Sequence, residues 1–276
     1  MKILVPTDFS DSANQALEYA AEIARATQSQ LTLLHVYSGQ AHLSSKIQIV
    51  ERLNLICQTT NTEYEPVVCI PMTRAGDVVD EILAEADDIG VDLIVMGTKG
   101  ATNLGRLFFG SNTASVIEKA TCPVLSVPGT HTFNKPQKML FSTNFSREEL
   151  NAAVQFVSLA KVFGATVIIA HVSVEHEREE VDASLVRVFA NDLSQTTNYD
   201  KIVTRIASDN TVSLGLDSLI AETGADIIAL STRRRGILEK MYNPSITKKY
   251  SLQADIPLMA FRADGDADRP GTILSV

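Results

Sequence analysis

The sequence lacks the features of membrane proteins and of general nucleic-acid binders. No stretch approaches 18 uninterrupted apolar residues, the length at which a membrane-spanning helix is expected. Basic residues number 24 against 33 acidic ones, for a net charge of −9, whereas a nucleic-acid binder normally carries a basic face. A single loop can still present positive potential through its backbone amides. We therefore predict no membrane and no nucleic-acid partner, and leave a nucleotide site open.

Cysteine is scarce. Cys57, Cys69 and Cys122 form no CxxC pair and have no nearby histidine. We interpret them as small, buried apolar residues in a reduced compartment, in preference to a metal or redox role. The opening MKILVPTDFS has an apolar run too short for a signal peptide. Together these features predict a cytoplasmic protein.

The common catalytic and phosphate-binding motifs are also missing. There is no G-x-S-x-G, no H-E-x-x-H and no cysteine with its own base. Gly100 and Gly105 have the first spacing of a Walker A loop, but Arg106-Leu107 follows where Lys-Ser or Lys-Thr is required. The dinucleotide fingerprint follows a first strand, whereas the glycines here follow the fourth.

What the chain does contain is an alternation of strands and helices. Its 276 residues, 45% of them apolar, suffice for one large domain or two of about 130–140 residues. Strands are predicted at 2–5, 31–37, 64–70, 93–96 and 124–127. A first helix is predicted with Ser10 or Asp11 as its cap, and further helices at 45–58 and 77–86. The pattern predicts an α/β fold with a doubly wound, five-stranded parallel sheet.

The pattern then repeats. KILVPTDFSDSANQAL is echoed by KMLFSTNFSREELNAAV, TLLHVY by IIAHVS, and VDLIVMGTKG by ADIIALSTRR. Asp8 and His35 match Asn144 and His171 at an offset of 136, while Asp92 and Pro123 match Asp226 and Pro257 at 134. A nearly constant offset indicates two copies of one domain. We predict domains at 1–130 and 137–264 and a tail at 265–276.

The two histidines could be mistaken for catalytic residues. His35 and His171 each lie near the end of an apolar strand and have no partner at a recognisable spacing. We interpret both as core or edge histidines that hydrogen-bond to neighbouring backbone.

The glycines after the fourth strand have the spacing Gly97-x2-Gly100-x9-Gly110-Ser111, and a helix follows. This spacing resembles the universal stress protein family, in the branch that binds ATP. Pro6-Thr7-Asp8-Phe9-Ser10 after the first strand and Leu-Leu-His-Val at 33–36 resemble the same family. The resemblance covers both repeats and implies two tandem Rossmann-like sheets, each of order 3-2-1-4-5, of the adenine nucleotide alpha hydrolase-like type.

The resemblance also implies a role for each matching residue. Asp8 would accept hydrogen bonds from the adenosine moiety, Pro6 and Thr7 would shape the pocket, and the Val36 backbone would pair with the adenine edge. Gly97 and Gly100 would let the loop wrap the ribose and phosphates, and Met96 and Thr98 would also belong to the binding site. Phosphate oxygens would be held by Gly110, Ser111, Asn112 and Thr113.

General geometry predicts the same place. Ligands of open parallel sheets bind at the carboxyl ends of strands where the strand order reverses, and a helix N-terminus favours an anion. Lys99 and Arg106 would either add positive charge or lie in solvent. The alternative is that the glycines serve only a tight turn.

The second copy departs from this pattern. At an offset of 134, Gly97, Gly100 and Gly110 become Ser231, Arg234 and Pro244, while Ser111 and Thr113 are kept as Ser245 and Thr247. Arg234 puts a side chain where bare backbone is needed, and Pro244 lacks an N–H. We expect the usual mode of nucleotide binding to be lost in this copy, although Arg233 to Arg235 could still attract an anion.

No set of residues for phosphoryl transfer is visible. The leading hypothesis is a stress-response protein that binds ATP, with Mg²⁺ on the phosphates, and uses occupancy as a signal. One alternative is an interaction scaffold without nucleotide. In it, the last strands, 123–127 and 257–261, would pair as an intramolecular pseudo-dimer, and two chains could form a homodimer. A weaker alternative is a slow ATPase.

Overall fold

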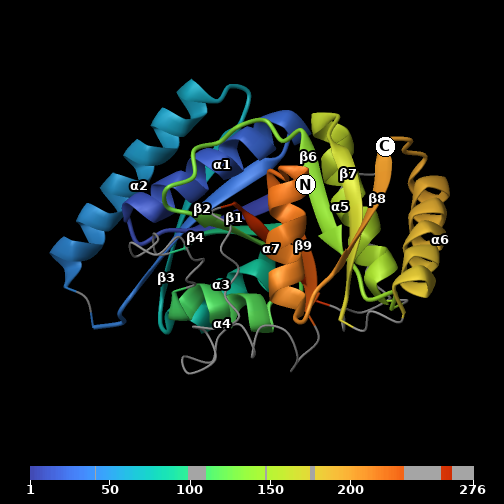
Figure 1. Cartoon of the computed structure of the whole chain (residues 1–276). Helices are drawn as coiled ribbons and strands as arrows, with labels where there is room; N and C mark the ends of the chain where they lie inside the picture. The colour runs from blue at the N-terminus through green and yellow to red at the C-terminus, as the bar shows by residue number, and fades with distance from the viewer. Residues whose placement is uncertain (41, 99–109, 147, 175–177, 233–255, 263–276) are drawn as a thin grey trace. The chain divides into compact units, whose positions relative to one another are not determined.

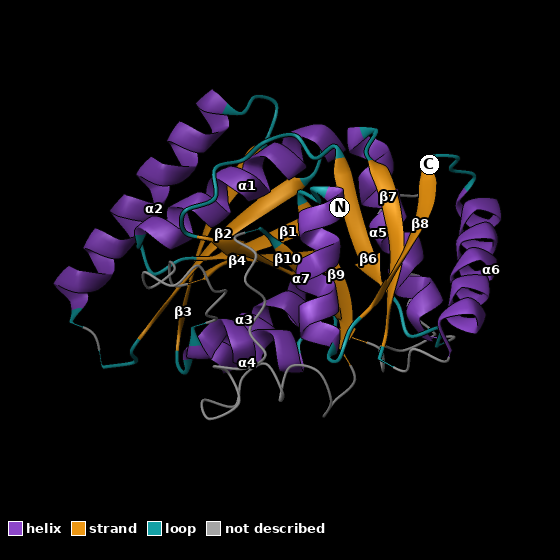
Figure 2. Cartoon of the chain, in the orientation of Figure 1, coloured by secondary structure: helices purple, strands orange, loops and turns teal. Residues whose placement is uncertain are grey.

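The structure is a computed structural model that describes residues 1–40, 42–98, 110–146, 148–174, 178–232 and 256–262. These residues divide into two compact units, which we call unit 1 (1–98 with 110–133) and unit 2 (134–262). Each unit contains strands that lie side by side, with helices packed on them (Figures 1 and 2).

Unit 1 is a five-stranded sheet of order β3-β2-β1-β4-β5, in which every pair is parallel. Its strands are β1 (Lys2–Pro6), β2 (Gln30–Tyr37), β3 (Val68–Ala75), β4 (Leu93–Thr98) and β5 (Val124–Pro128). Its helices are α1 (Asp11–Thr27), α2 (Leu43–Glu63), α3 (Val78–Ile89) and α4 (Ser111–Lys119). Helices α1 and α2 lie on one face of the sheet and α3 and α4 on the other (Figure 1), as right-handed crossovers require.

Local sequence signals set the ends of these helices. Ser10 caps α1 by accepting a hydrogen bond from the Ala13 N–H, and Asp77 caps α3 in the same way. Gly90 ends α3 at φ 63°, a left-handed conformation in which glycine carries no steric penalty. The central strand β1 is apolar and fully buried over residues 3–5, which places the core of unit 1 around it.

The predicted third strand was misplaced. The sequence pattern put it at 64–70, whereas β3 runs from Val68 to Ala75 and α2 continues to Glu63. Tyr64 instead forms the corner, since its N–H donates to the Thr60 carbonyl at the end of α2. Pro71 lies within β3, which is possible because this strand is at the edge of the sheet.

Unit 2 repeats the same topology, with the parallel order β10-β9-β6-β7-β8. Its strands are β6 (Lys138–Ser142), β7 (Thr166–Ser173), β8 (Ile202–Ser208), β9 (Ile227–Thr232) and β10 (Leu258–Arg262). Its helices are α5 (Glu148–Phe163), α6 (Glu179–Thr197) and α7 (Val212–Thr223). Taken in chain order the strands again read 3-2-1-4-5, so the predicted fold class is confirmed for both copies. Among the described helices, none is long and apolar enough to cross a membrane.

Candidate functional site

The loop after β1 is held by hydrogen bonds within the loop and by contacts with β2. The Thr7 N–H donates to the Leu34 carbonyl at 2.8 Å, and the Thr7 hydroxyl accepts from the Phe9 N–H at 3.0 Å. Phe9 is in the left-handed region at φ 64°, and its ring stacks on His35 with centroids 4.5 Å apart. His35 in turn contacts the Thr7 carbonyl through Nδ1 at 2.8 Å, which confirms its predicted structural role.

Asp8 is exposed at the tip of this loop. Its Oδ1 accepts the Ser10 N–H at 3.0 Å, which fixes the direction of the carboxylate. Partial burial raises the pKa of Asp8, but hydrogen bonds from Ser10 lower it, and the net pKa lies below its usual value. Asp8 is therefore a fixed, ionised acceptor at the carboxyl end of β1.

Val36 lies at the carboxyl end of β2 and is half-buried. The Leu34 carbonyl faces β1, because it accepts from Thr7. Backbone groups alternate in direction along a strand, so the N–H and C=O of Val36 face the same side as those of Leu34. The last ladder pair between β1 and β2 is Pro6 with Leu34. The Val36 backbone thus faces the space beyond the end of β1.

Gly97 is required by close packing against α1. A Cβ atom at this position would lie 2.2 Å from the Ser12 carbonyl oxygen in the first turn of α1. The Gly97 carbonyl accepts from the Thr113 hydroxyl at 3.1 Å, which joins the end of β4 to the start of α4. Thr113 is buried, as are Met96 and Thr98 on either side of Gly97. The hydrogen bond from Thr113 therefore fixes the end of β4 against the start of α4.

The N-terminus of α4 completes this end of the sheet. Gly110 is its N-cap and supplies no side-chain hydrogen bond, and Ser111 and Asn112 are exposed. The first N–H groups of a helix have no intrahelical partner and carry a partial positive charge. Such a terminus suits an anion. The predicted loop residues Lys99, Gly100 and Arg106 lie outside the described residues.

Unit 2 has a buried carboxylate at the equivalent loop. Glu149, the counterpart of Ala13 at the offset of 136, is 3% exposed. It accepts from the Thr143 hydroxyl at 2.7 Å and from the Asn144 N–H at 2.9 Å. The Asx turn itself is kept, because the Ser146 N–H donates to Asn144 Oδ1 at 3.1 Å. Sequence reasoning did not single out Glu149, although its alignment with Ala13 is readable from the repeat.

The end of β7 is also covered in unit 2. Val172, the counterpart of Val36, is 5% exposed. Helix α7 approaches it so closely that a Cβ on Gly215 would lie 2.3 Å from Val172 Cγ1. Asp182, in the first turn of α6, accepts from the Ser173 hydroxyl at 2.8 Å and lies 3.6 Å from His171 Nε2. His171 also contacts the Thr143 carbonyl at 2.7 Å, again as predicted. Arg234, Pro244, Ser245 and Thr247 lie outside the described residues.

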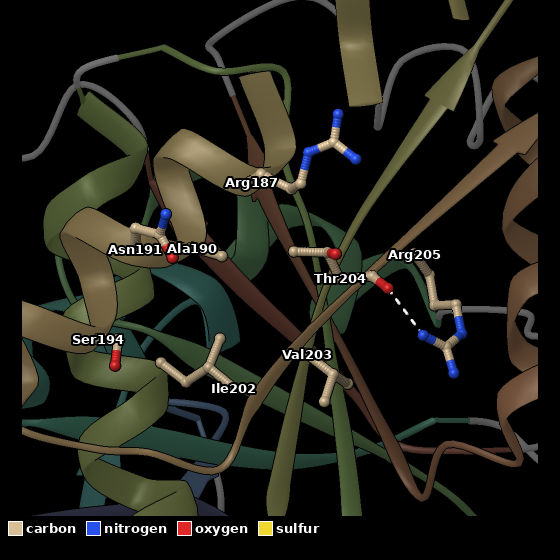
Figure 3. A pocket seen from close by; sticks show the side chains of 8 residues that line it. All are labelled: Arg187, Ala190, Asn191, Ser194, Ile202, Val203, Thr204 and Arg205. Carbon is tan, nitrogen blue, oxygen red and sulfur yellow. Dashed lines mark hydrogen bonds between the residues drawn. The ribbon is translucent and has the colours of Figure 1, made fainter. Parts of the chain in front are cut away.

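A hollow of about 420 Å³ in unit 2 lies elsewhere, between α6 and the first half of the edge strand β8 (Figure 3). Two arginines line it, and Arg205 donates to the Thr204 carbonyl at 2.8 Å. Arg187 is the second arginine, and the remaining lining residues are Ala190, Asn191, Ser194, Ile202 and Val203. It is not at the carboxyl ends of the strands. Within the described part of the chain, no group of three or more His, Cys, Asp or Glu side chains could hold a metal ion.

The model of the universal stress protein family matches the chain twice, at residues 1–128 and 136–262. The chain belongs to the universal stress protein family. A universal stress protein of Methanocaldococcus jannaschii is 30% identical over 155 residues, which cover 46% of this chain and 93% of that protein. The universal stress protein YxiE of Bacillus subtilis is 30% identical over 144 residues, or 46% of this chain and 97% of its own.

A solved structure matches both copies together. A universal stress protein from Archaeoglobus fulgidus superimposes with a TM-score of 0.75, over 95% of this chain and 98% of that one, at 21% identity. At this identity the match shows the fold alone. The single-domain relatives cover about half of this chain, and the family model matches twice, so this member of the family has tandem domains.

Proposed function

We propose that unit 1 binds ATP, with Mg²⁺ on its phosphates, at the carboxyl ends of β1, β2 and β4. The observation that carries this proposal is the pairing of an α4 N-terminus that has no side-chain cap with the close packing of Gly97, at the end of β4, against α1. An anion is stabilised at such a terminus. The Val36 backbone faces the same end of the sheet and provides a donor and an acceptor for the adenine edge.

The other contacts follow from the geometry of the loops. Asp8 is exposed, ionised and fixed by Ser10, and it would accept hydrogen bonds from the adenosine moiety. Ser111 and Asn112 would hold phosphate oxygens. Gly100 would let the loop approach the phosphates, while Pro6, Thr7, Met96 and Thr98 would shape the walls. Thr113 was expected to hold a phosphate oxygen, but it is buried and its hydroxyl donates to the Gly97 carbonyl. Mg²⁺ would be held mainly by the phosphates, as Mg²⁺ often is in nucleotide sites.

The second copy has a different role in this proposal. Glu149 and Asp182 put two buried carboxylates at the strand ends of unit 2, where a nucleotide would have to enter. Negative charge there opposes a polyphosphate. We propose one nucleotide site per chain, in a domain spanning 1–130. The domain spanning 137–264 and the tail at 265–276 contribute no second site.

Isothermal titration calorimetry of the purified full chain with MgATP tests the proposal. We expect one saturable site per chain, and no saturable binding at millimolar nucleotide would contradict it. Asp8→Asn should weaken binding, because the amide cannot replace both carboxylate acceptors. Asn144→Asp makes the reverse exchange at the equivalent loop of unit 2. It should leave the affinity unchanged and serves as the matched control.

A second variant tests the loop itself. Gly100→Arg combined with Gly110→Pro gives the loop of the first copy the residues of the second, and should abolish binding. Its circular dichroism and thermal midpoint report whether the fold is kept. Retained affinity in a folded variant would show that this loop is not the site.

The buried carboxylates of unit 2 favour a second candidate function, an interaction scaffold without nucleotide. Nucleotide released from the purified protein on denaturation separates the two, since a pure scaffold would carry none. Pairing through the last strands, a homodimer and a cytoplasmic location stay predictions, and light scattering tests the homodimer. Slow ATP hydrolysis is the weaker alternative, and phosphate release from MgATP measures it.

A further inference from the structure

Two cysteines that are 12 positions apart in the sequence meet in unit 1. Cys57 lies on α2 and Cys69 on the edge strand β3, and their Sγ atoms are 2.8 Å apart. Their side chains belong to residues that are 3% and 4% exposed. The sequence interpretation treated each as a separate apolar residue. The structure confirms the burial of these two, whereas Cys122 is only half-buried. It also brings the thiols of Cys57 and Cys69 into direct contact.

Hydrogen bonds hold the two elements in this position. Asn61 on α2 accepts the Cys69 N–H through Oδ1 at 2.6 Å, one turn beyond Cys57. At the corner, the Tyr64 N–H donates to the Thr60 carbonyl and the Val67 N–H to the Tyr64 carbonyl, each at 3.0 Å. These hydrogen bonds hold the segment between Cys57 and Cys69 with the two thiols already in contact, so that little rearrangement is needed for the sulfurs to bond.

We propose that Cys57 and Cys69 form a reversible intramolecular disulfide when the protein is exposed to a peroxide, and that this bond joins α2 to β3. The disulfide would be a modification site of the first domain, and its formation does not require that unit 1 bind a nucleotide.

The reaction balances with hydrogen peroxide as the oxidant. The Cys57 thiolate attacks one peroxide oxygen, the O–O bond breaks, and the departing hydroxide takes up a proton as water. The sulfur of Cys69 then attacks the resulting sulfenic acid at Cys57, and the S–O bond breaks. The second water leaves with the proton of Cys69. Two thiols lose two electrons, and one peroxide becomes two waters.

The contact also assigns the order of the two steps. The hydrogen bond from Cys69 lowers the pKa of the Cys57 thiol more than burial raises it, whereas the same contact raises the pKa of Cys69. The thiolate is the reactive form, so in this proposal Cys57 attacks the peroxide and Cys69 is the resolving thiol, an order that capture of the sulfenic acid tests.

Helix α2, which the disulfide would tether, buries few of its side chains and reaches the carboxyl end of the sheet. The buried residues of α2 are only Leu53, Cys57 and Thr60. The same helix places the Arg52 guanidinium 4.3 Å from the ring centroid of Phe9, next to Asp8. A bond at Cys57 would therefore restrain a helix that contacts the loop after β1 through Arg52 and Phe9.

The test uses the full chain with Cys122→Ser, so that only Cys57 and Cys69 remain. The protein is treated with hydrogen peroxide, quenched and denatured in N-ethylmaleimide, and its mass is measured. We expect the mass to fall by two hydrogens, with no added maleimide, whereas the reduced sample should carry two. Dithiothreitol should restore both thiols. The oxidised protein should also melt at a higher temperature than the reduced protein.

Control variants keep the result interpretable. Cys57→Ser and Cys69→Ser, each with Cys122→Ser, should form no intramolecular bond, and only Cys57 should yield a sulfenic acid that dimedone captures. Two maleimides on the treated protein, or a sulfinic acid at Cys57 in place of the bond, would overturn the proposal. If Cys122→Ser does not fold, peptide mapping of the oxidised wild type decides. A Cys57–Cys69 link supports the proposal, and a link through Cys122 refutes it.

Discussion

A glycine at the end of β4 could be needed for packing against α1 or for contact with a nucleotide. Replacing Gly97 by alanine would separate these two reasons. A Cβ atom there would lie 2.2 Å from the Ser12 carbonyl oxygen and 2.5 Å from its carbon, and both are backbone atoms of α1. No side chain can rotate away to relieve this contact. Because carbon atoms pack at about 3.5–4.0 Å, the start of α1 would have to move by about 1 Å relative to β4.

The structure gives the size of the effect. Overpacking of a dense interior costs about 1–3 kcal/mol. Each kcal/mol lowers the melting temperature by about 2–4 °C in chains of about 150–250 residues. We therefore expect Gly97→Ala to melt several degrees below the wild type. The shift should be present without nucleotide, because it comes from contact between α1 and β4.

Differential scanning calorimetry of the apo protein measures this shift. Gly39→Ala is the matched control, since a Cβ on Gly39 has nothing within 4 Å, and it should stay within about 0.5 kcal/mol of the wild type. Equal melting temperatures for the two variants would refute the reasoning. Glycine at position 97 would then be needed only for ligand binding.

Three further predictions concern single side chains. Because the folded pKa of Asp8 lies below its usual 3.8, its ionised form stabilises the fold above that pH. The stability difference between wild type and Asp8→Ala in urea titrations should therefore shrink as the pH falls through the folded pKa, and a pH-independent difference would contradict this. Arg74→Met should cost about 3–5 kcal/mol in urea unfolding, because it leaves the Glu85 carboxylate, with a side chain 2% exposed, without its ion pair; a loss under about 1 kcal/mol would argue against it. Gly215→Ala should destabilise unit 2 by about 1–3 kcal/mol in calorimetry, because its Cβ meets Val172 Cγ1 at 2.3 Å; adding Val172→Ala should make the Gly215 change less costly, and unchanged cost would refute the contact.

The sequence misplaced β3 for a physical reason. Edge strands are not buried on both sides, so β3 alternates weakly and even contains Pro71. The run from Tyr64 to Ile70 was more apolar than the true strand, but its first residues form the corner after α2. Central strands such as β1 and β4 were predicted within one or two residues of their observed ends, because burial on both faces makes them apolar throughout.

The sequence by itself determined that the chain has two copies of one α/β fold, whereas the strand order 3-2-1-4-5 was implied only by the resemblance to the family. Repeat spacing, apolar runs and turn residues are local properties that can be read along the chain. The contacts that join distant segments were decided only by the tertiary structure. Folding sets Gly97 against Ser12, places Cys57 beside Cys69, and buries Glu149 at the strand ends of unit 2. Such contacts depend on helix positions to within about an ångström in a close-packed interior, and no residue pattern specifies those positions.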